Sequence, residues 1–380
     1  MNWKRKLKND WGLLGLKYKP LSDIANYVID RIEVDKLTLD NYISTENMIS
    51  NKGGVGKSAK LPRSKTTASY KKGDVLISNI RPYFKKIWFS KNDGGCSNDI
   101  LVLRAKEGIH PEYLYYVLSN DSFFEYATAT SKGTKMPRGD KQAIMKYRVP
   151  DISLDIQIKI ADMLSTIDEL IYENNKINEN LECQISTLYK SWFEDFELNG
   201  GVCPEKWKNQ KFSLIANFSN GKRPSIKDKK LTKNTPYPII GAASVMGFTS
   251  NFNHTDKILV IGRVGTHGIV QRFNIPCWVS DNAITIKSNF YEFTHQVLKR
   301  IDYSSLNRGS TQPLITQSDL KKVNILVPDI KSLEKFENIA GTLMNQWEVR
   351  QQENIKLSIL RDTLLTKLIS GEIDVSSISI

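Results

Sequence analysis

The sequence predicts a mixed α+β protein in which two similar globular domains alternate with two long helices. The main observation is a repeated boundary, because Val149-Pro150-Asp151 and Val327-Pro328-Asp329 each close a basic, aromatic-bearing stretch and each precede a heptad-patterned segment. Short motifs also recur in the same order within both basic stretches. We therefore expect a first domain over 1–150, a first spacer helix over 151–198, a second domain over 199–328 and a second spacer helix over 329–375.

Charge follows the same four-part division. Residues 1–150 carry 27 Lys+Arg against 15 Asp+Glu (+12), and residues 199–328 carry 18 against 7 (+11). The helical segments carry 3 against 11 over 151–198 (−8) and 6 against 8 over 329–380 (−2). A generally basic composition would raise the net charge without sparing the helices. Two separate cationic bodies indicate a polyanion that is bound at two places.

The composition argues against a secreted, membrane or metal-dependent protein. The basic start Met1–Lys6 is not followed by an apolar run, and no apolar stretch approaches the length of a membrane span. We therefore expect a cytoplasmic protein. The four cysteines and four histidines show no metal-ligand spacing, so we expect neither zinc nor a disulfide. These residues are Cys96, Cys183, Cys203, Cys277, His110, His254, His267 and His295.

The first spacer segment is typical of a coiled-coil helix. Ser153-Leu154-Asp155 supplies a capping hydroxyl and a first-turn carboxylate, so we expect the helix to begin there. Apolar residues then alternate at spacings of four and three, which keeps one seam facing a partner helix. The seam consists of Ile160, Leu164, Ile167, Ile171, Asn174, Asn178, Leu181, Ile185, Leu188 and Trp192.

The second spacer segment starts in the same way, with Ser332-Leu333-Glu334 after Pro328. Ile339 and Leu360 fit a neighbouring register, so the sequence leaves the register open. If the two helices pack antiparallel, the polar residues in the middle of each seam lie near one another and fix the register. Two helices packed separately on their own domains are the alternative. The seam in the first register is Phe336, Ala340, Leu343, Trp347, Arg350, Asn354, Leu357, Leu364 and Leu368.

The predicted helix length suggests a spacer. A helix over 153–196 would span on the order of 65 Å at 1.5 Å per residue. Two recognition sites on one face of B-DNA need centres roughly 34 Å apart or more. We therefore expect the helix pair to hold the two basic domains at a set separation.

The two domains share strand and loop motifs in the same order. In the first, Asp74–Ser78 is expected to be a buried strand and Lys86–Phe89 a second one; Asp256–Ile261 and Gly268–Val270 correspond to them. This comparison places Arg81 and Arg263 at equivalent positions, just after the first of these strands in each domain. Ser97-Asn98-Asp99 corresponds to Ser280-Asp281-Asn282, and Gly133–Pro137 to Gly309–Pro313. Helices are expected over 111–124 and 293–303, with core-facing aromatic or aliphatic faces.

The loops differ between the halves, as expected of two modules that read different base sequences. Lysine and arginine suit phosphate and guanine contacts, whereas amides and hydroxyls suit adenine edges. A solvated loop that contacts nothing is the alternative for each residue. Our candidate DNA-binding residues are Lys52, Lys57, Lys60, Arg81, Tyr83, Lys132, Lys135, Arg138, Lys141, Lys222, Arg223, Arg263, His267, Arg308, Thr311, Gln312 and Gln317.

With these motifs the whole chain resembles the specificity subunit of type I restriction-modification systems. The resemblance implies two target-recognition domains that each read half of a bipartite double-stranded DNA site, and two helices that form an antiparallel coiled coil and dock methyltransferase subunits, two in number. It implies a chain with no active site and no cofactor. S-adenosylmethionine would bind the methyltransferase subunits, and ATP with Mg would bind nuclease-translocase subunits. The motifs are Tyr42–Met48, Gly73–Pro82, Ser97–Asp99, Gly133–Pro137 and the repeated Val-Pro-Asp.

One motif favours a different class of protein. Lys52–Ser58 (KGGVGKS) resembles the phosphate-binding loop of partition-type ATPases. Such a loop needs a buried strand before it and a helix directly after it. Ile43–Ser50 is largely polar, and Lys60–Ser64 contains a proline where the helix would start. We therefore interpret the segment as a flexible cationic loop, with Lys52, Lys57, Lys60, Arg63 and Lys65 free to follow a DNA backbone.

Overall fold

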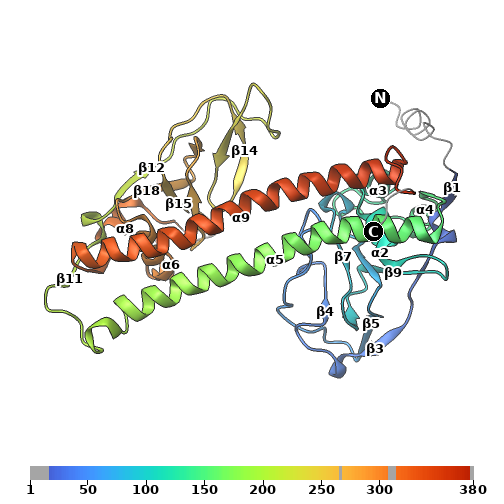
Figure 1. Ribbon diagram of the computed structural model, residues 1–380, viewed down its shortest axis with the longest axis horizontal. Coiled ribbons are helices and arrows are strands. Elements are labelled where there is room, and N and C mark those ends of the chain that lie inside the picture. Colours follow the sequence, from blue (N-terminus) through green and yellow to red (C-terminus); the bar gives the residue numbers. More distant parts are fainter. Residues whose placement is uncertain (1–16, 265–267, 307–313, 377–380) are drawn as a thin grey trace. The chain divides into compact units, whose positions relative to one another are not determined.

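The computed structural model describes residues 17–264, 268–306 and 314–376 of the chain (Figure 1). It divides into two compact units. Unit 1 comprises 1–174 and 352–380, and unit 2 comprises 175–351. Both unit boundaries fall inside long helices, α5 (Leu154–Phe193) and α9 (Ile330–Ser370). The four-part division of the sequence therefore follows the motifs, whereas each compact unit combines one globular part with a portion of both helices.

The described residues of unit 1 form two four-stranded sheets and a two-stranded one. The first sheet has the order β2 (Ala25–Tyr27), β9 (Ile100–Ala105), β6 (Val75–Ser78), β7 (Ile87–Phe89). The second has the order β3 (Arg31–Glu33), β5 (Thr66–Tyr70), β8 (Gly94–Cys96), β4 (Tyr42–Ile43). β1 (Tyr18–Pro20) pairs antiparallel with β10 (Arg148–Pro150), which ties the start of the described chain to the motif before α5.

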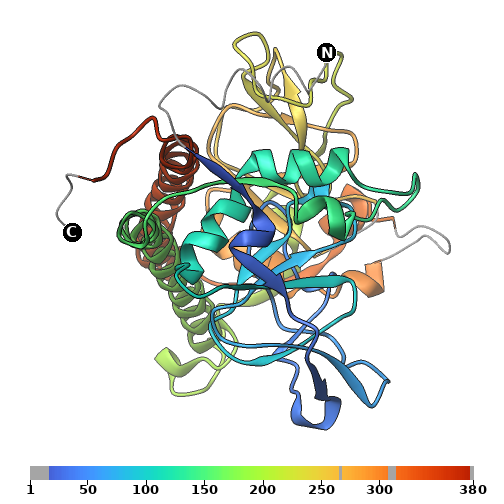
Figure 2. The same ribbon diagram turned by 90° about the vertical axis from the view of Figure 1, so that its right-hand side faces the viewer.

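Short helices complete unit 1. The α-helices are α2 (Pro111–Ser119), α3 (Asp121–Ala129) and α4 (Lys141–Ile144), and the 3-10 turns are η1 (Leu21–Asp23), η2 (Val34–Lys36) and η3 (Pro82–Phe84). The helix expected over 111–124 is interrupted at Asn120, whose side chain caps α3 by accepting from the Ser122 amide. Helix α2 packs on β6, β7 and β9 (Figure 2).

Unit 2 repeats this plan. Its first sheet has the order β12 (Asn217–Asn220), β18 (Ala283–Lys287), β15 (Ile258–Gly262), β16 (Val270–Phe273), so each strand has a counterpart at the same place in unit 1. The second sheet is smaller, with β14 (Val245–Thr249), β13 (Tyr237–Ile240) and β17 (Trp278–Val279). β11 (Lys208–Lys211) pairs with β19 (Asn324–Val327) as β1 pairs with β10.

The helical parts of unit 2 follow the same order. They are α6 (Tyr291–Arg300), α7 (Tyr303–Leu306) and α8 (Gln317–Lys322), with 3-10 turns η4 (Glu197–Asn199) and η5 (Phe212–Leu214). Helix α6 packs on β15 and β16 in the way that α2 packs on its sheet. The expected duplication of a mixed α/β domain is confirmed.

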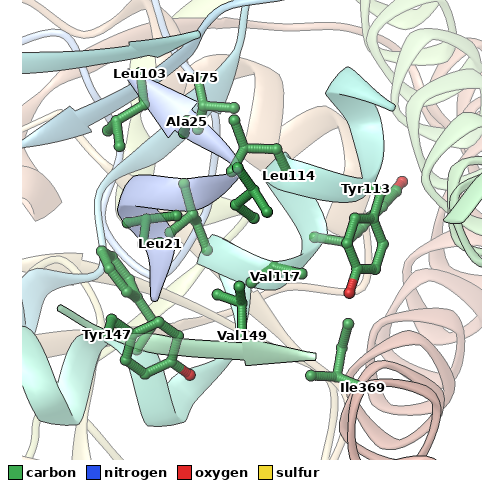
Figure 3. Packing of buried hydrophobic residues seen from close by; sticks show 14 of the residues in the cluster. Leu21, Ala25, Val75, Leu103, Tyr113, Leu114, Val117, Tyr147, Val149 and Ile369 are labelled. Carbon is green, nitrogen blue, oxygen red and sulfur yellow. The ribbon is translucent and has the colours of Figure 1, made fainter. Parts of the chain in front are cut away.

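The core of unit 1 includes the end of helix α9. Leu21, Val75, Leu114 and Val149 form it together with the first turns of α5, and Ile369 at the end of α9 packs into the same cluster (Figure 3). Unit 2 has a matching core, in which Phe293 of α6 contacts Tyr189 and Phe193 of α5 and Phe336 of α9. Burial of these apolar surfaces is the main stabilising contribution to each unit.

The capping residue of helix α9 is Asp329 and not Ser332. Its first residue is Ile330, and Asp329 caps it by accepting from the amide of Ser332 at 3.1 Å and from its hydroxyl at 3.0 Å. The second carboxylate oxygen of Asp329 also accepts from the Trp207 indole at 2.8 Å. An aspartate at this position satisfies free amides and favours the positive end of the helix.

Candidate nucleic-acid interface

The loop over 132–138 is closed at its base by two backbone hydrogen bonds. The Lys132 amide donates to the Arg138 carbonyl at 2.8 Å, and the Arg138 amide donates back to the Lys132 carbonyl at 2.9 Å. Lys135 and Met136 are exposed at the tip. At the base, Arg138 pairs with Asp99 at 3.0 Å and Lys132 with Asp140 at 2.6 Å. The loop thus presents cations from a fixed base, and Lys141 lies exposed at the start of α4.

The turn after β6 holds two further candidates. Arg81 and Lys85 flank η3 with φ angles of 50° and 51°, in the left-handed region. Tyr83 lies exposed between them. The Arg81 amide donates to the Pro137 carbonyl at 2.7 Å, which joins this turn to the loop over 132–138.

The glycine-rich segment Lys52–Ser58 forms a tight turn rather than a phosphate-binding loop. Three of its backbone amides already have partners: Lys52 donates to Lys85 at 2.8 Å, Gly56 to Asn47 at 2.8 Å and Ser58 to Leu39 at 2.9 Å. No helix follows Ser58 before β5 begins at Thr66. A phosphate-binding loop requires free amides at a helix N-terminus. The segment has no helix to follow it, and three of its amides are already bonded.

The expectation that Lys52 is free to follow a DNA backbone is wrong. Its side chain is 9% exposed, and its ammonium lies 3.0 Å from Asp121 on α3 and 3.7 Å from Asp362 on α9. Lys85 contacts the same Asp121 at 2.7 Å. Burial opposes ionisation of Asp121, but the hydrogen bonds from Lys85 and Lys52 hold its pKa below the usual value. Lys52 therefore fastens the glycine-rich turn to α3 and α9.

Two further cations of the predicted loop, Lys57 and Lys60, line a polar cavity of about 360 Å³ in unit 1. Lys57 is exposed and pairs with Asp40 at 3.1 Å, and Lys60 is exposed. Facing them are Ser97 and Asp99, which follow β8. The other lining residues are Tyr42, Ser44, Thr45, Glu46, Asn47, Ser58, Ala59, Leu61 and Pro62.

Arg81 and Arg263 are not equivalent, so that prediction is wrong by two residues. Ser78 pairs with Ile100 as Gly262 pairs with Ala283, so Arg263 occupies the position in unit 2 that Asn79 occupies in unit 1. The Asn79 amide donates to Asp99 at 2.8 Å, as the Arg263 amide donates to Asn282 at 2.9 Å. The sequence comparison aligned the two arginines wrongly because both lie near the end of a strand. Only the strand pairing shows how many residues separate each arginine from its strand.

The candidates of unit 2 are partly described. Lys222 and Arg223 are exposed, and the Lys222 carbonyl accepts from the Trp278 indole at 2.6 Å, which fixes this loop to β17. Gln317 is half-buried at the start of α8, where Thr316 forms a capping box with Asp319. His267, Arg308, Thr311 and Gln312 lie outside the described residues.

Within unit 1 the two helices contact each other in antiparallel order. Asn174 of α5 donates to Asn354 of α9 at 3.0 Å, and Asp168 of α5 accepts from Arg361 of α9 at 2.7 Å. Residues later in α5 thus contact residues earlier in α9, as in an antiparallel pair (Figure 1). The predicted seam residues of this unit are buried or half-buried: Ile160, Leu164, Ile167, Ile171, Asn174, Asn354, Leu357, Leu364 and Leu368.

The seam residues of unit 2 are also buried or half-buried. Asn178 is buried, and neither of its amide atoms has a hydrogen-bond partner among the described residues. Ile339 of unit 2 and Leu360 of unit 1, which fit the neighbouring register, are 44% and 47% exposed. The other seam residues of unit 2 are Leu181, Ile185, Leu188, Trp192, Phe336, Ala340, Leu343, Trp347 and Arg350.

An acidic residue of the long helix α9 binds the start of α6 within unit 2. Glu337 of α9 accepts from the backbone amides of Glu292 and Phe293 at 3.1 and 2.8 Å, at the start of α6. Burial raises the pKa of Glu337 to about 7. Nearby, Glu292 forms two hydrogen bonds with Arg272 at 2.6 and 2.8 Å, and burial lowers the pKa of His295 to about 3. Sequence reasoning missed these residues because nothing in their spacing distinguishes them from surface charges.

Within residues 17–264, 268–306 and 314–376, no group of three or more His, Cys, Asp or Glu is arranged to hold a metal ion. In the same part of the chain, no helix is long and apolar enough to cross a membrane.

Comparison with known proteins gives a consistent result. The family model described as type I restriction modification DNA specificity domain matches residues 16–183 and 204–357. The MjaIX specificity subunit of Methanocaldococcus jannaschii is 23% identical over 420 residues, covering 98% of this chain and 96% of its own. The HindI specificity subunit of Haemophilus influenzae is 22% identical over 467 residues, covering 96% and 100%.

A solved structure has a similar fold. The type I restriction-modification S subunit of M. genitalium aligns with a TM-score of 0.56 at 17% sequence identity. The alignment covers 94% of this chain and 97% of that one. At this identity the likeness concerns the fold alone.

Proposed function

Because the chain belongs to the type I restriction modification DNA specificity family, we propose that each of its two units reads one half of a bipartite site in double-stranded DNA. Members of this family supply DNA sequence recognition to a restriction-modification system and are not themselves catalytic. The bipartite reading, the spacing of the halves and the docking of partner subunits go beyond that family role.

The observation that carries the bipartite proposal is the duplicated sheet. The orders β2-β9-β6-β7 and β12-β18-β15-β16 match strand for strand, while the loops that follow the strands differ in length and side chains. One scaffold with two loop sets supports two different base sequences. The balances of +12 and +11 in the two globular stretches, counted from the sequence, support binding to the same polyanion.

The experiment uses the full chain with its methyltransferase and a duplex that contains the methylated site. Phosphate contacts release counterions, so the affinity should fall steeply between about 50 and 200 mM salt. Replacing one half-site with random sequence should weaken binding about as much as replacing the other. Affinity that is unchanged by either replacement would contradict the bipartite proposal.

The helices are proposed to set the spacing between the halves. Each is unbroken over about 40 residues, which corresponds to about 60 Å at 1.5 Å per residue. A seven-residue insertion after Asn174 and another after Gln351 would keep the heptad register and lengthen both helices by about 10 Å. We expect the gap between the half-sites to grow by about 3 base pairs at 3.4 Å each, with both half-site sequences unchanged.

The outer faces of the helices are proposed to dock two methyltransferase subunits, which nuclease-translocase subunits join. In unit 1, Leu170 on α5 and Ile355 and Ile359 on α9 are exposed in spite of their apolar side chains. Exposed apolar residues on a helix favour a protein partner. Ile355→Glu with Ile359→Glu should abolish co-purification of methyltransferase, whereas Lys356→Glu, at an exposed polar position between them, should not.

Catalytic cofactors are assigned to the partners. S-adenosylmethionine would bind the methyltransferase subunits, and ATP with Mg would bind the nuclease-translocase subunits. Equilibrium dialysis of the isolated chain should then show no binding of either molecule. Stoichiometric binding to this chain alone would contradict the assignment.

A further inference from the structure

We propose that the Arg81–Lys85 turn of unit 1 is a wedge that inserts an aromatic side chain into the base stack of its half-site. The inference rests on the proposed DNA-reading function and specifies how one of its surfaces acts. It assigns a mechanical role to Tyr83 and Phe84, whose rings the folded core does not use.

The two rings stand on the surface beside each other. Tyr83 is 47% exposed and Phe84 is 38% exposed. Their centroids lie 4.8 Å apart at an interplanar angle of 61°. Exposing two adjacent aromatic rings forgoes the stabilisation that burial would give them. A surface that retains such a pair is a candidate for contact with a partner.

The turn that carries the rings is strained and rigidly held. Arg81 and Lys85 are two of only five non-glycine residues with positive φ in the described part of the chain. Such conformations persist where the surroundings fix them, and they cluster at functional sites. Here the Asn51 amide donates to the Phe84 carbonyl and the Lys52 amide to the Lys85 carbonyl, both at 2.8 Å.

Two further contacts fix the other sides of the turn. The Arg81 amide donates to the Pro137 carbonyl at 2.7 Å, and the Lys85 ammonium contacts Asp121 of α3 at 2.7 Å. The glycine-rich turn, the loop over 132–138 and α3 therefore hold the aromatic tip at the same time. A wedge must resist the stacking energy of the step it opens, and this base provides that resistance.

The charges around the tip favour DNA as its occupant. Arg81 begins the turn, and its Nε is buried without a hydrogen-bond partner among the described residues. Lys135 and Arg138 lie on the loop that is bonded to Arg81. An aromatic pair bordered by guanidinium and ammonium groups suits a nucleobase with its phosphates better than an apolar protein surface.

Insertion at a base step has a consequence for the partner enzyme. Apolar or aromatic wedges unstack one step and kink the duplex, at a cost of a few kcal/mol per step. An enzyme that modifies a base must take it out of the stack, and prior unstacking lowers that cost. The wedge would thus link recognition by unit 1 to base extrusion by the methyltransferase.

The test uses the full chain with its methyltransferase and duplexes in which 2-aminopurine replaces one base at a time through each half-site. Unstacking raises the fluorescence of this base. We expect a several-fold increase at one step of a single half-site with the wild-type chain. The increase should disappear in Tyr83→Ala/Phe84→Ala and persist in Tyr83→Leu/Phe84→Leu, because leucine also acts as a wedge.

The affinity should fall about tenfold to a hundredfold in the alanine pair, as expected from the loss of aromatic stacking. Phe252→Ala is the matched control, because Phe252 is 44% exposed but belongs to unit 2. It should leave the fluorescence of the unit 1 half-site unchanged. Circular dichroism of each variant reports folding. If the alanine pair is unfolded, Tyr83→Ala alone, which removes only the more exposed ring, takes its place and should lower the fluorescence increase.

Several outcomes overturn the proposal. Site-specific binding by the wild-type chain without increased fluorescence at any position refutes the wedge and leaves the DNA-reading function intact. Increased fluorescence that survives in the alanine pair assigns the unstacking to other residues. Loss of methyltransferase co-purification in the alanine pair, with DNA contacts unchanged, makes the turn a protein-docking surface. Absence of site-specific binding by the wild-type complex refutes both the wedge and the proposed function.

Discussion

The carboxylate of Asp168 joins three helices of unit 1, and its removal should destabilise the unit. It accepts from Arg361 of α9 at 2.7 Å and from the Tyr116 hydroxyl of α2 at 2.9 Å. The Arg361 and Asp168 side chains are only 17% and 29% exposed. Breaking a fully buried pair by removing one partner costs about 3–5 kcal/mol. Since water reaches part of this pair, we expect Asp168→Asn to lower the free energy of unfolding of unit 1 by about 2 kcal/mol.

The assay is urea denaturation followed by hydrogen exchange, which reports α2 and the second half of α9 separately from unit 2. Glu33→Gln is the matched control, because Glu33 pairs with Lys36 at 2.7 Å but both side chains are largely exposed. The control should not shift the midpoint measurably. Arg361→Met completes a double-mutant cycle and isolates the pair energy. A change in Asp168→Asn no larger than in the control would refute the reasoning that burial makes this pair important.

Three further predictions concern single residues. Burial raises the pKa of Glu337 to about 7, so the folded state binds this proton more tightly than the unfolded state does. Relative to Glu337→Gln, the free energy of unfolding of the wild-type chain should therefore fall by about 2–3 kcal/mol as pH rises from about 4.5 to about 7. Profiles of unfolding free energy against pH that run parallel for the two proteins would contradict this. Lys57 pairs with Asp40, so neither the wild-type chain nor Lys57→Ala should hydrolyse ATP; phosphate release that Lys57→Ala abolishes would restore the ATPase interpretation. Arg81→Ala and Arg263→Ala should each relax specificity by about 1–3 kcal/mol in one half-site only, and methylation mapping that shows equal loss in both halves would refute the assignment.

The architecture was predictable because its signals are periodic and repeated. Val149-Pro150-Asp151 and Val327-Pro328-Asp329 lie in strands β10 and β19 and at the entries to α5 and α9. Heptad spacing depends only on helix geometry, so the seam could be written from the sequence. The register of the second helix could not be written in the same way. Ile339 and Leu360 are apolar and so fit a second seam, yet they are exposed.

Long-range contacts were beyond sequence reasoning. Nothing near Lys52 indicates that its ammonium lies beside Asp362, some 300 residues later in the chain. The glycine pattern around it suggested phosphate chemistry, whereas the glycines serve a tight turn in which an added Cβ at Gly53 would lie 2.5 Å from Ile49. Likewise, the end of α9 completes the core of unit 1 through Ile369, a contact that local patterns do not encode.

Mapping methylated bases in DNA from cells that express this chain with its methyltransferase tests the central claim most directly. If each unit recognises its own half-site and the helices set the spacing, there is one recognition sequence. It consists of two specified halves separated by a gap of constant length and arbitrary sequence. One contiguous motif, or two half-sites at variable separation, would contradict the account.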